Sequence, residues 1–238
     1  MISTTASKLT SKYQATILNL DLNNLDLFMT STSTTLPLLI MTIQDVIKEN
    51  ENEVAELDRA IGDGDHVVNL QRGLEALAKM EQELTALEWS AAFIKIGMTL
   101  MSTMGGASGS LFGTLFIAMG KAAKDNDLDL THFADVFAQG VASVKQRGKA
   151  DLGEKTMLDT LIPVANSLVS DANNHIELAL AIENVKQAAV TGMKSTKDLL
   201  ATKGRASFLG ERAIGHIDAG ARTSQLMICA IADVLMKN

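Results

Sequence analysis

Three aspartates, Asp58, Asp63 and Asp65, lie within eight residues of this chain. Carboxylates this close repel one another, so a fold that brings them together needs a compensating cation. Carboxylate oxygens suit hard cations such as magnesium or calcium. The two glycines between them, Gly62 and Gly64, free the backbone to turn, so that the three side chains can converge. The segment therefore predicts a metal site, and a magnesium site of this kind usually takes phosphates as its remaining ligands.

A second interpretation of the same segment is a helix N-terminal loop in which an aspartate acts as the cap. An EF-hand is excluded because its loop needs a glutamate at the twelfth position, which is Asn69 counted from Asp58 and Leu74 counted from Asp63. His66 and Asn69 open the next predicted helix on one face. Phosphate placed there would meet free backbone N–H groups and the positive end of the helix dipole. For His66 the alternative is a solvent-exposed cap residue.

Three further glycine-rich segments could contribute to one site, or could each be an ordinary connection between helices. They are residues 105–113, 148–159 and 203–220. The first could cradle phosphate oxygens with backbone N–H groups and the Ser108 hydroxyl. The second is not a Walker A loop, because Lys155 follows Gly153 one residue late and no strand precedes it. The third carries Arg205, whose planar fork suits phosphate, in a connection longer than the roughly two to eight residues usual between helices.

The composition predicts a single helical domain. The chain has 238 residues, 47% of them apolar but only 4% aromatic, with two prolines, which is typical of a helix bundle. A net charge of -7 argues against nucleic acid or an anionic membrane surface as the main partner. The single cysteine, Cys229, excludes an internal disulfide and suits a reducing compartment. No apolar run approaches the roughly 20 residues of a membrane span, so we expect a soluble, cytoplasmic protein.

Residues 1–35 are rich in Ser, Thr and Asn, and we expect a poorly ordered N-terminal extension before a single all-α domain at 36–238. From Leu36 onward the apolar residues follow a helical period. The predicted helices lie near residues 37–52, 66–84, 88–104, 110–125, 131–147, 156–171, 176–201 and 221–236. In an antiparallel bundle, alternate loops emerge at the same end. The aspartates and the three glycine-rich segments follow the first, third, fifth and seventh helices, so all four are predicted at one end.

Four segments in this order resemble the nucleotide-binding L subunit of bacterial dihydroxyacetone kinase. They are LDRAIGDGDHVVNLQRG, GGASGSLFGTLF, RGKADLGEKTMLDTLIP and KGRASFLGERAIGHIDAGA. The resemblance extends from about residue 36 to the C-terminus. It implies a barrel of eight amphipathic antiparallel helices with ADP or ATP at one end. It also implies two magnesium ions held by Asp58, Asp63 and Asp65, which bridge to the nucleotide phosphates.

The same resemblance implies a set of nucleotide contacts. They are His66, Asn69, Ala107, Ser108, Gly148, Met157, Arg205, Asp218, Ala219 and Gly220. The family often has Asp-Pro-Gly where this chain has Ala219, so a less rigid turn is expected there. Arg205 is the expected catalytic residue, with Lys155 as an alternative for stabilising charge on the transferred phosphoryl group.

In this family the L subunit does not bind the triose, which a separate K subunit holds. The resemblance therefore implies half of an enzyme. In the phosphoenolpyruvate-dependent systems, a phosphotransferase subunit M rephosphorylates ADP that stays on L, and free ATP is the alternative donor. Two other functions stay open: a nucleotide-sensing regulator without kinase turnover, and a kinase subunit for another small ketose such as erythrulose.

Overall fold

The computed structural model describes residues 32–124 and 128–237, and the regular structure in these ranges is entirely helical. The eight long helices are α3 (Thr32–Glu49), α5 (His66–Ala78), α7 (Trp89–Thr103), α8 (Gly106–Ala122), α9 (Leu130–Gly148), α10 (Leu158–Asn173), α11 (Leu178–Ser195) and α12 (Ala219–Lys237). The shorter elements are α4 (Glu51–Ile61), α6 (Glu81–Leu84) and the 3-10 helices η1 (Thr196–Asp198) and η2 (Arg205–Ala213). None of the helices in the described ranges combines the length and apolar character that a membrane crossing requires.

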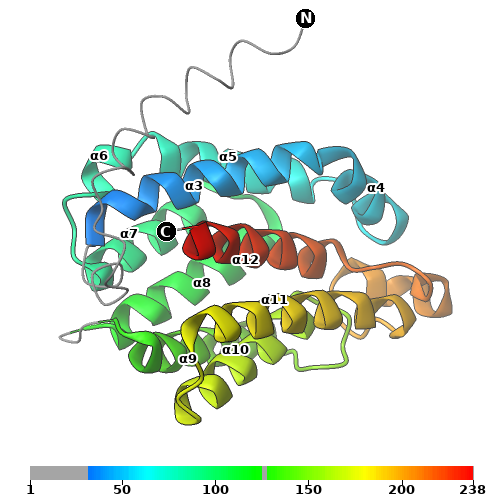
Figure 1. Cartoon of the computed structure of the whole chain (residues 1–238). Coiled ribbons are helices and arrows are strands. Elements are labelled where there is room, and N and C mark those ends of the chain that lie inside the picture. The colour runs from blue at the N-terminus through cyan, green and yellow to red at the C-terminus, as the bar shows by residue number, and fades with distance from the viewer. Residues whose placement is uncertain (1–31, 125–127, 238) are drawn as a thin grey trace, which may run out of the picture.

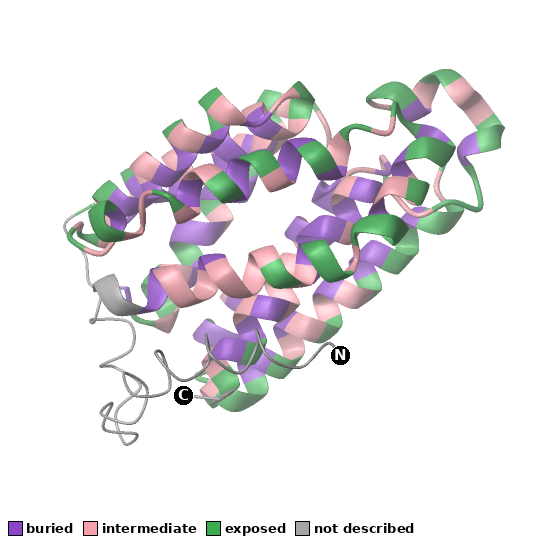
Figure 2. Cartoon of the chain, turned by 90° about the horizontal axis from the view of Figure 1, so that it is seen from above, coloured by how far each residue is buried: buried purple, intermediate pink, exposed green. Residues whose placement is uncertain are grey.

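The eight long helices form a closed ring. Each packs against the next one along the chain, and α12 returns to pack against α3 (Figure 1). Buried and exposed positions alternate along the individual helices, as expected for amphipathic helices around a shared core (Figure 2). One continuous cluster of buried apolar side chains, which includes Ile47 and Val144, is built from all eight. The predicted all-α barrel of eight helices is thereby confirmed.

Several predicted helix boundaries were wrong. Helix α3 begins at Thr32, inside the stretch assigned to the N-terminal extension; residues 1–31 of that stretch lie outside the described residues. The predicted helix at 66–84 ends at Ala78, and the one at 176–201 ends at Ser195. Helix α4 was not predicted at all. It extends the chain beyond α3 at one end of the ring, where η2 also lies (Figure 1).

Helices α10 and α11 approach each other unusually closely at Gly192. Pro163 has no N–H, so the Asp159 carbonyl four residues earlier receives no helical hydrogen bond from it. The backbone of α11 passes directly over this carbonyl, and a Cβ atom at Gly192 would lie 2.1 Å from the Asp159 oxygen. This contact requires glycine, and it fixes α11 against the start of α10.

Candidate functional site

The three aspartates converge where α4 meets α5. Asp58 is buried in the last turn of α4 rather than in a loop, while Asp63 and Asp65 are exposed. Each contributes an oxygen that lies within 4.8 Å of the other two. The turn depends on Gly64, which has a φ of 79°, and on Gly62, where a Cβ atom would lie 2.0 Å from Asp58 Oδ1. Asp58 bonds the first N–H of α5, but Asp65, which precedes α5, makes no side-chain capping bond, so helix capping alone does not explain why the three carboxylates meet.

The cluster fits a hard divalent cation. Its donors are all carboxylate oxygens, which magnesium prefers. One of them, Asp58 Oδ2, accepts a hydrogen bond from the His66 backbone N–H at 3.0 Å, which fixes its orientation. Arg205 Nη2 lies 2.6 Å from Asp63 Oδ2 and offsets part of the negative charge.

His66 links three helices at the site. Its Nδ1 lies 3.0 Å from Ser108 Oγ in α8, and its Nε2 lies 2.9 Å from Thr223 Oγ1 in α12. Thr223 Oγ1 also lies 3.1 Å from the Ala219 carbonyl, to which only its hydroxyl can donate. We therefore assign the ring proton to Nε2, which donates to Thr223, while Nδ1 accepts from Ser108. Burial lowers the pKa of His66, against the opposing effect of Asp58, so the neutral ring is favoured. His66 is thus a partly buried, fully bonded residue and not a solvent-exposed cap.

The N-terminal ends of helices meet around the aspartates. Ala107 and Ser108 lie in the first turn of α8, and Asn69 lies in the first turn of α5. Asn69 is buried, its Oδ1 accepts a hydrogen bond from Arg72 Nη1 at 3.1 Å, and a Cβ atom at Gly105 would lie 2.6 Å from the same oxygen. The predicted glycine-rich loop is therefore mostly the start of α8. Its free N–H groups and positive dipole end favour phosphate.

The segment between α9 and α10 is held by Lys155 and Asp159. Lys155 is 1% exposed and has a φ of 61°. Its Nζ donates to the carbonyl oxygens of Thr196 and His216, and burial lowers its pKa. The Asp159 carboxylate accepts the N–H groups of Gly153 at 2.6 Å and of Thr156 at 2.7 Å. The expectation that Lys155 could reach a transferred phosphoryl group was wrong, because its ammonium group is committed to these two carbonyls.

Gly148 and Met157 bracket this segment. Gly148 ends α9, and Met157 is a buried residue immediately before α10. A Cβ atom at Gly220 would lie 3.5 Å from Met157 Cβ, so the segment contacts the start of α12.

The long segment between α11 and α12 is more ordered than a loop. It contains η1 and η2, and its residues Ala206 and Ala213 pack with Ile61 of α4 in a small separate apolar cluster. Arg205 follows Gly204, which has a φ of 62°. The Arg205 side chain is 70% exposed and extends toward Asp63. The aspartate segment and the Arg205 segment are therefore in contact, as predicted.

The Asp218-Ala219-Gly220 turn leads into α12. Asp218 Oδ2 accepts the Ala221 N–H at 2.7 Å, which is a helix-capping bond. The Asp218 N–H donates to Thr196 Oγ1 at 3.1 Å. Burial, with contributions from Asp159 and Asp58, raises the pKa of Asp218 to about 7.

The structure thus brings together the four segments singled out in the sequence. It also adds Thr223 as the partner of His66, a residue that the sequence analysis missed. Thr223 is separated from His66 by 157 positions, and no local pattern marks it. The structural role of Asp159 was missed too, although an aspartate in the first turn of a helix that follows a glycine-broken loop is a common capping signal.

Comparison with known proteins identifies relatives along most of the chain. Residues 60–233 match the model of the DAK2 domain. The chain is 42% identical over 185 residues to the ADP-binding subunit DhaL of a PEP-dependent dihydroxyacetone kinase from Listeria innocua, covering 78% of this chain and 88% of the relative. It is 39% identical over 189 residues to the corresponding subunit of the PTS-dependent dihydroxyacetone kinase from Lactococcus lactis, covering 79% of this chain and 91% of that subunit.

A solved structure has the same fold. The dihydroxyacetone kinase of C. freundii, crystallised with AMP-PNP and Mg2+, superposes with a TM-score of 0.68 at 24% identity. The superposition covers 86% of this chain but only 34% of that kinase. The domain match and the two bacterial relatives together show that this chain belongs to the DAK2 domain family, in the group of DhaL ADP-binding subunits of dihydroxyacetone kinases.

Proposed function

We propose that this chain is the nucleotide-binding subunit of a dihydroxyacetone kinase and that it holds magnesium-bound ADP or ATP at one end of its helical ring. The observation that carries the proposal is the meeting of Asp58, Asp63 and Asp65 with the N-terminal ends of α5, α8 and α12. Carboxylates alone would repel a nucleotide. Together with magnesium and the positive ends of three helix dipoles, they form a site for a polyphosphate.

The three aspartates would hold two magnesium ions, which supply charge neutralisation at the phosphate oxygens when bound. The chain's own groups orient the nucleotide. Ala107 and Ser108 would present N–H groups to phosphate, with Asn69 beside them. Gly148, Met157, Asp218, Ala219 and Gly220 would adjoin the phosphate site and contact the base and ribose. Neutral His66 in α5 joins the N-terminal ends of α8 and α12 through its hydrogen bonds to Ser108 and Thr223.

Arg205 is the proposed catalytic residue. Its guanidinium is exposed, follows a glycine and already lies against a proposed magnesium ligand. A planar cation at this position can bind and stabilise charge on a phosphoryl group during transfer. Phosphoryl transfer needs positioning and charge stabilisation more than covalent chemistry from the protein, which suits a site without an evident base among these residues.

A K subunit that carries dihydroxyacetone is the proposed partner, and an M-type phosphotransferase subunit is the proposed source of phosphate. Support comes from the exposed apolar side chains near Arg205. Phe208 in η2 is 87% exposed, and Leu200 and Ile214 on either side of η2 are 48% and 44% exposed. Apolar side chains exposed at the rim of a site are typical of protein docking surfaces. A cytoplasmic location, expected from the composition, belongs to the same proposal.

The test is a coupled measurement of dihydroxyacetone phosphate with this chain alone, a cognate K subunit alone, and both together. Each mixture contains magnesium and is supplied with ATP, or with ADP and a phosphorylated M subunit. We expect product only when both chains are present. The Arg205→Ala variant should then lower kcat by roughly 100-fold or more, as loss of a charge-stabilising group does at comparable sites.

The alternatives give different results. Product from this chain alone would overturn the half-enzyme proposal. Nucleotide binding without turnover, with either donor and a cognate K subunit, would favour a nucleotide-sensing regulator. Faster turnover with erythrulose than with dihydroxyacetone would assign another ketose.

A further inference from the structure

We infer that Arg222 is a positioning residue for the metal site: by clamping α4 to α12, it sets where the Asp58 carboxylate lies. The inference rests on the proposed function, because it takes Asp58 to be a magnesium ligand. Arg222 lies outside the four segments that the sequence singled out, and none of its contacts is to the aspartates themselves.

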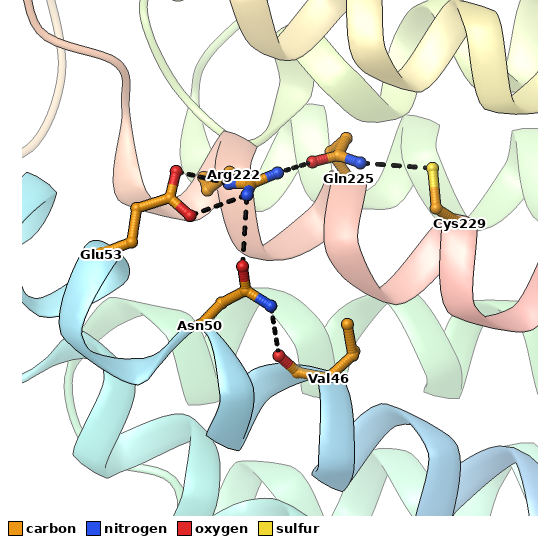
Figure 3. Close-up of polar contacts among 6 residues, drawn as sticks. All are labelled: Val46, Asn50, Glu53, Arg222, Gln225 and Cys229. Carbon is orange, nitrogen blue, oxygen red and sulfur yellow. Dashed lines mark hydrogen bonds and ion pairs between the residues drawn. The ribbon is translucent and has the colours of Figure 1, made fainter.

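Arg222 uses all three guanidinium nitrogens (Figure 3). Nε and Nη2 donate to the two carboxylate oxygens of Glu53 at 3.0 and 2.7 Å, a bidentate ion pair. Nη2 also lies 3.4 Å from Asn50 Oδ1, and Nη1 donates to Gln225 Oε1. Gln225 is itself held by a contact of 3.2 Å from its Nε2 to Cys229 Sγ. The Arg222 side chain is 17% exposed and that of Glu53 is 48% exposed, so the arginine end of the pair is largely shielded from solvent while the glutamate end is open to it.

The contacts of Arg222 lie at the junction between α3 and α4, where the helix is interrupted. The helix breaks at Asn50 between α3 and α4, with φ and ψ of -102° and 12°, and no side chain caps the start of α4. Asn50 Nδ2 turns back to the Val46 carbonyl at 2.7 Å. Backbone hydrogen bonds still cross the break, from the Asn50 N–H to Val46 at 3.2 Å and from the Val54 N–H to Asn50 at 3.0 Å. Helix α4 therefore follows α3 at a bend, and contacts outside these two helices help to set its direction. Arg222 holds the break through Asn50 and the first turn of α4 through Glu53.

The opposite end of α4 carries Asp58, which is also tied to α12. Asp58 accepts the His66 N–H, and the His66 ring contacts Thr223, the neighbour of Arg222 in sequence. Helix α4 is thus attached to one turn of α12 at both ends, at its start by Arg222 and at its end through His66. The start of α4 is also packed into the core through Val54. Without Arg222, this packing and the connection to α3 alone hold that end, so α4 can tilt and turn the Asp58 carboxylate relative to Asp63 and Asp65.

The experiment measures Mn2+ affinity at saturating ADP, and ADP affinity at saturating Mn2+, by calorimetry on the full chain. Arg222→Gln should weaken Mn2+ binding by about tenfold, the effect typical of residues that orient metal ligands, while ADP affinity changes much less. The Mn2+ affinity of Arg222→Lys should fall between those of the wild type and Arg222→Gln, because an ammonium cannot make the bidentate pair.

Glu53→Gln should reproduce the loss of Mn2+ affinity. The double variant should bind Mn2+ no more weakly than either single variant, since both substitutions remove the same interaction.

Lys186→Gln is the matched control. It removes an ion pair of similar length, Lys186 to Asp233 at 2.8 Å, which joins α12 to α11 and not to α4, together with a contact of 3.4 Å to Glu183 within α11. The control should lose a comparable amount of thermal stability and keep full Mn2+ affinity. If Arg222→Gln and Glu53→Gln both bind Mn2+ as the control does, while Asp58→Asn does not, the inference about Arg222 is wrong. If Asp58→Asn also binds Mn2+ normally, the metal site itself is wrong.

Discussion

Asp218 shows how strongly the fold alters a single side chain at this site. Its carboxylate caps α12 and is surrounded by three groups from other parts of the chain: Lys155 before α10, Asp159 in α10 and Asp58 in α4. Burial and the two neighbouring aspartates favour the protonated form, and the Ala221 N–H and Lys155 only partly oppose them. At its raised pKa of about 7, Asp218 is therefore poised to titrate near neutral pH.

This shift predicts a pH dependence of stability. The pKa of Asp218 rises from an ordinary 3.8 to about 7 in the folded chain. Between these values the folded chain keeps a proton that the unfolded chain has released, so the free energy of unfolding falls as pH rises through this window and levels off above it. Asp218→Asn cannot titrate but keeps an oxygen for the Ala221 N–H. The variant should therefore gain stability relative to the wild type as pH rises.

Urea unfolding of both proteins, followed by far-UV circular dichroism at several pH values across the window, checks this prediction. Comparing the two proteins cancels the titration of groups such as His66, whose lowered pKa also affects the wild type in this range. Parallel stability curves for the variant and the wild type would show that Asp218 has an ordinary pKa.

At the scale of elements, the eight ring helices could be predicted because each carries an apolar stripe long enough to show a helical period. Helix α4 could not. Its buried positions are only Val54, Asp58 and Ile61, and one of these is charged, so its pattern resembles a polar connection. The 3-10 helix η2 was missed for a different reason. Gly204 precedes it and Gly210 interrupts it, both with positive φ values, and it is ordered by packing on Ile61, a contact that sequence alone does not show.

The close approach of α10 and α11 gives a prediction at this scale. Gly192→Ala places a Cβ atom 2.1 Å from the Asp159 carbonyl oxygen, which belongs to the backbone and cannot rotate away. The helices must separate, so we expect a loss of roughly 1–3 kcal/mol in the free energy of unfolding. In a helix without such a contact, the same change would be stabilising by about 0.5–1 kcal/mol.

Gly148→Ala is the control for this variant. The nearest atom to a Cβ at Gly148 is Leu111 Cδ2 at 3.5 Å, an ordinary contact. Thermal melts in the absence of nucleotide should place Gly192→Ala well below the wild type and Gly148→Ala near it. Equal melting temperatures for the two variants would mean that α10 and α11 can separate freely.

At the scale of the whole molecule, the closed ring explains how residues from distant parts of the chain form one site. Alternate helices of an antiparallel ring start at the same end, so α5, α8, α10 and α12 all begin there. This rule predicted the meeting of the four segments before any contact was known. It could not predict the pairs that join them, such as Lys155 with the Thr196 and His216 carbonyls, because those depend on side-chain packing.

The measurement that tests the central claim most directly is calorimetry of ADP binding, with and without magnesium, to the wild type and to Asp63→Asn. Asp198→Asn is the control, since it removes the same charge from an exposed position in η1 at this end of the ring. We expect magnesium-dependent ADP binding to the wild type and the control, and a loss of roughly 100-fold in Asp63→Asn, because a charged metal ligand and the partner of Arg205 are both removed. Equal, magnesium-dependent affinity in all three proteins would contradict the assignment of these carboxylates as the metal-nucleotide site.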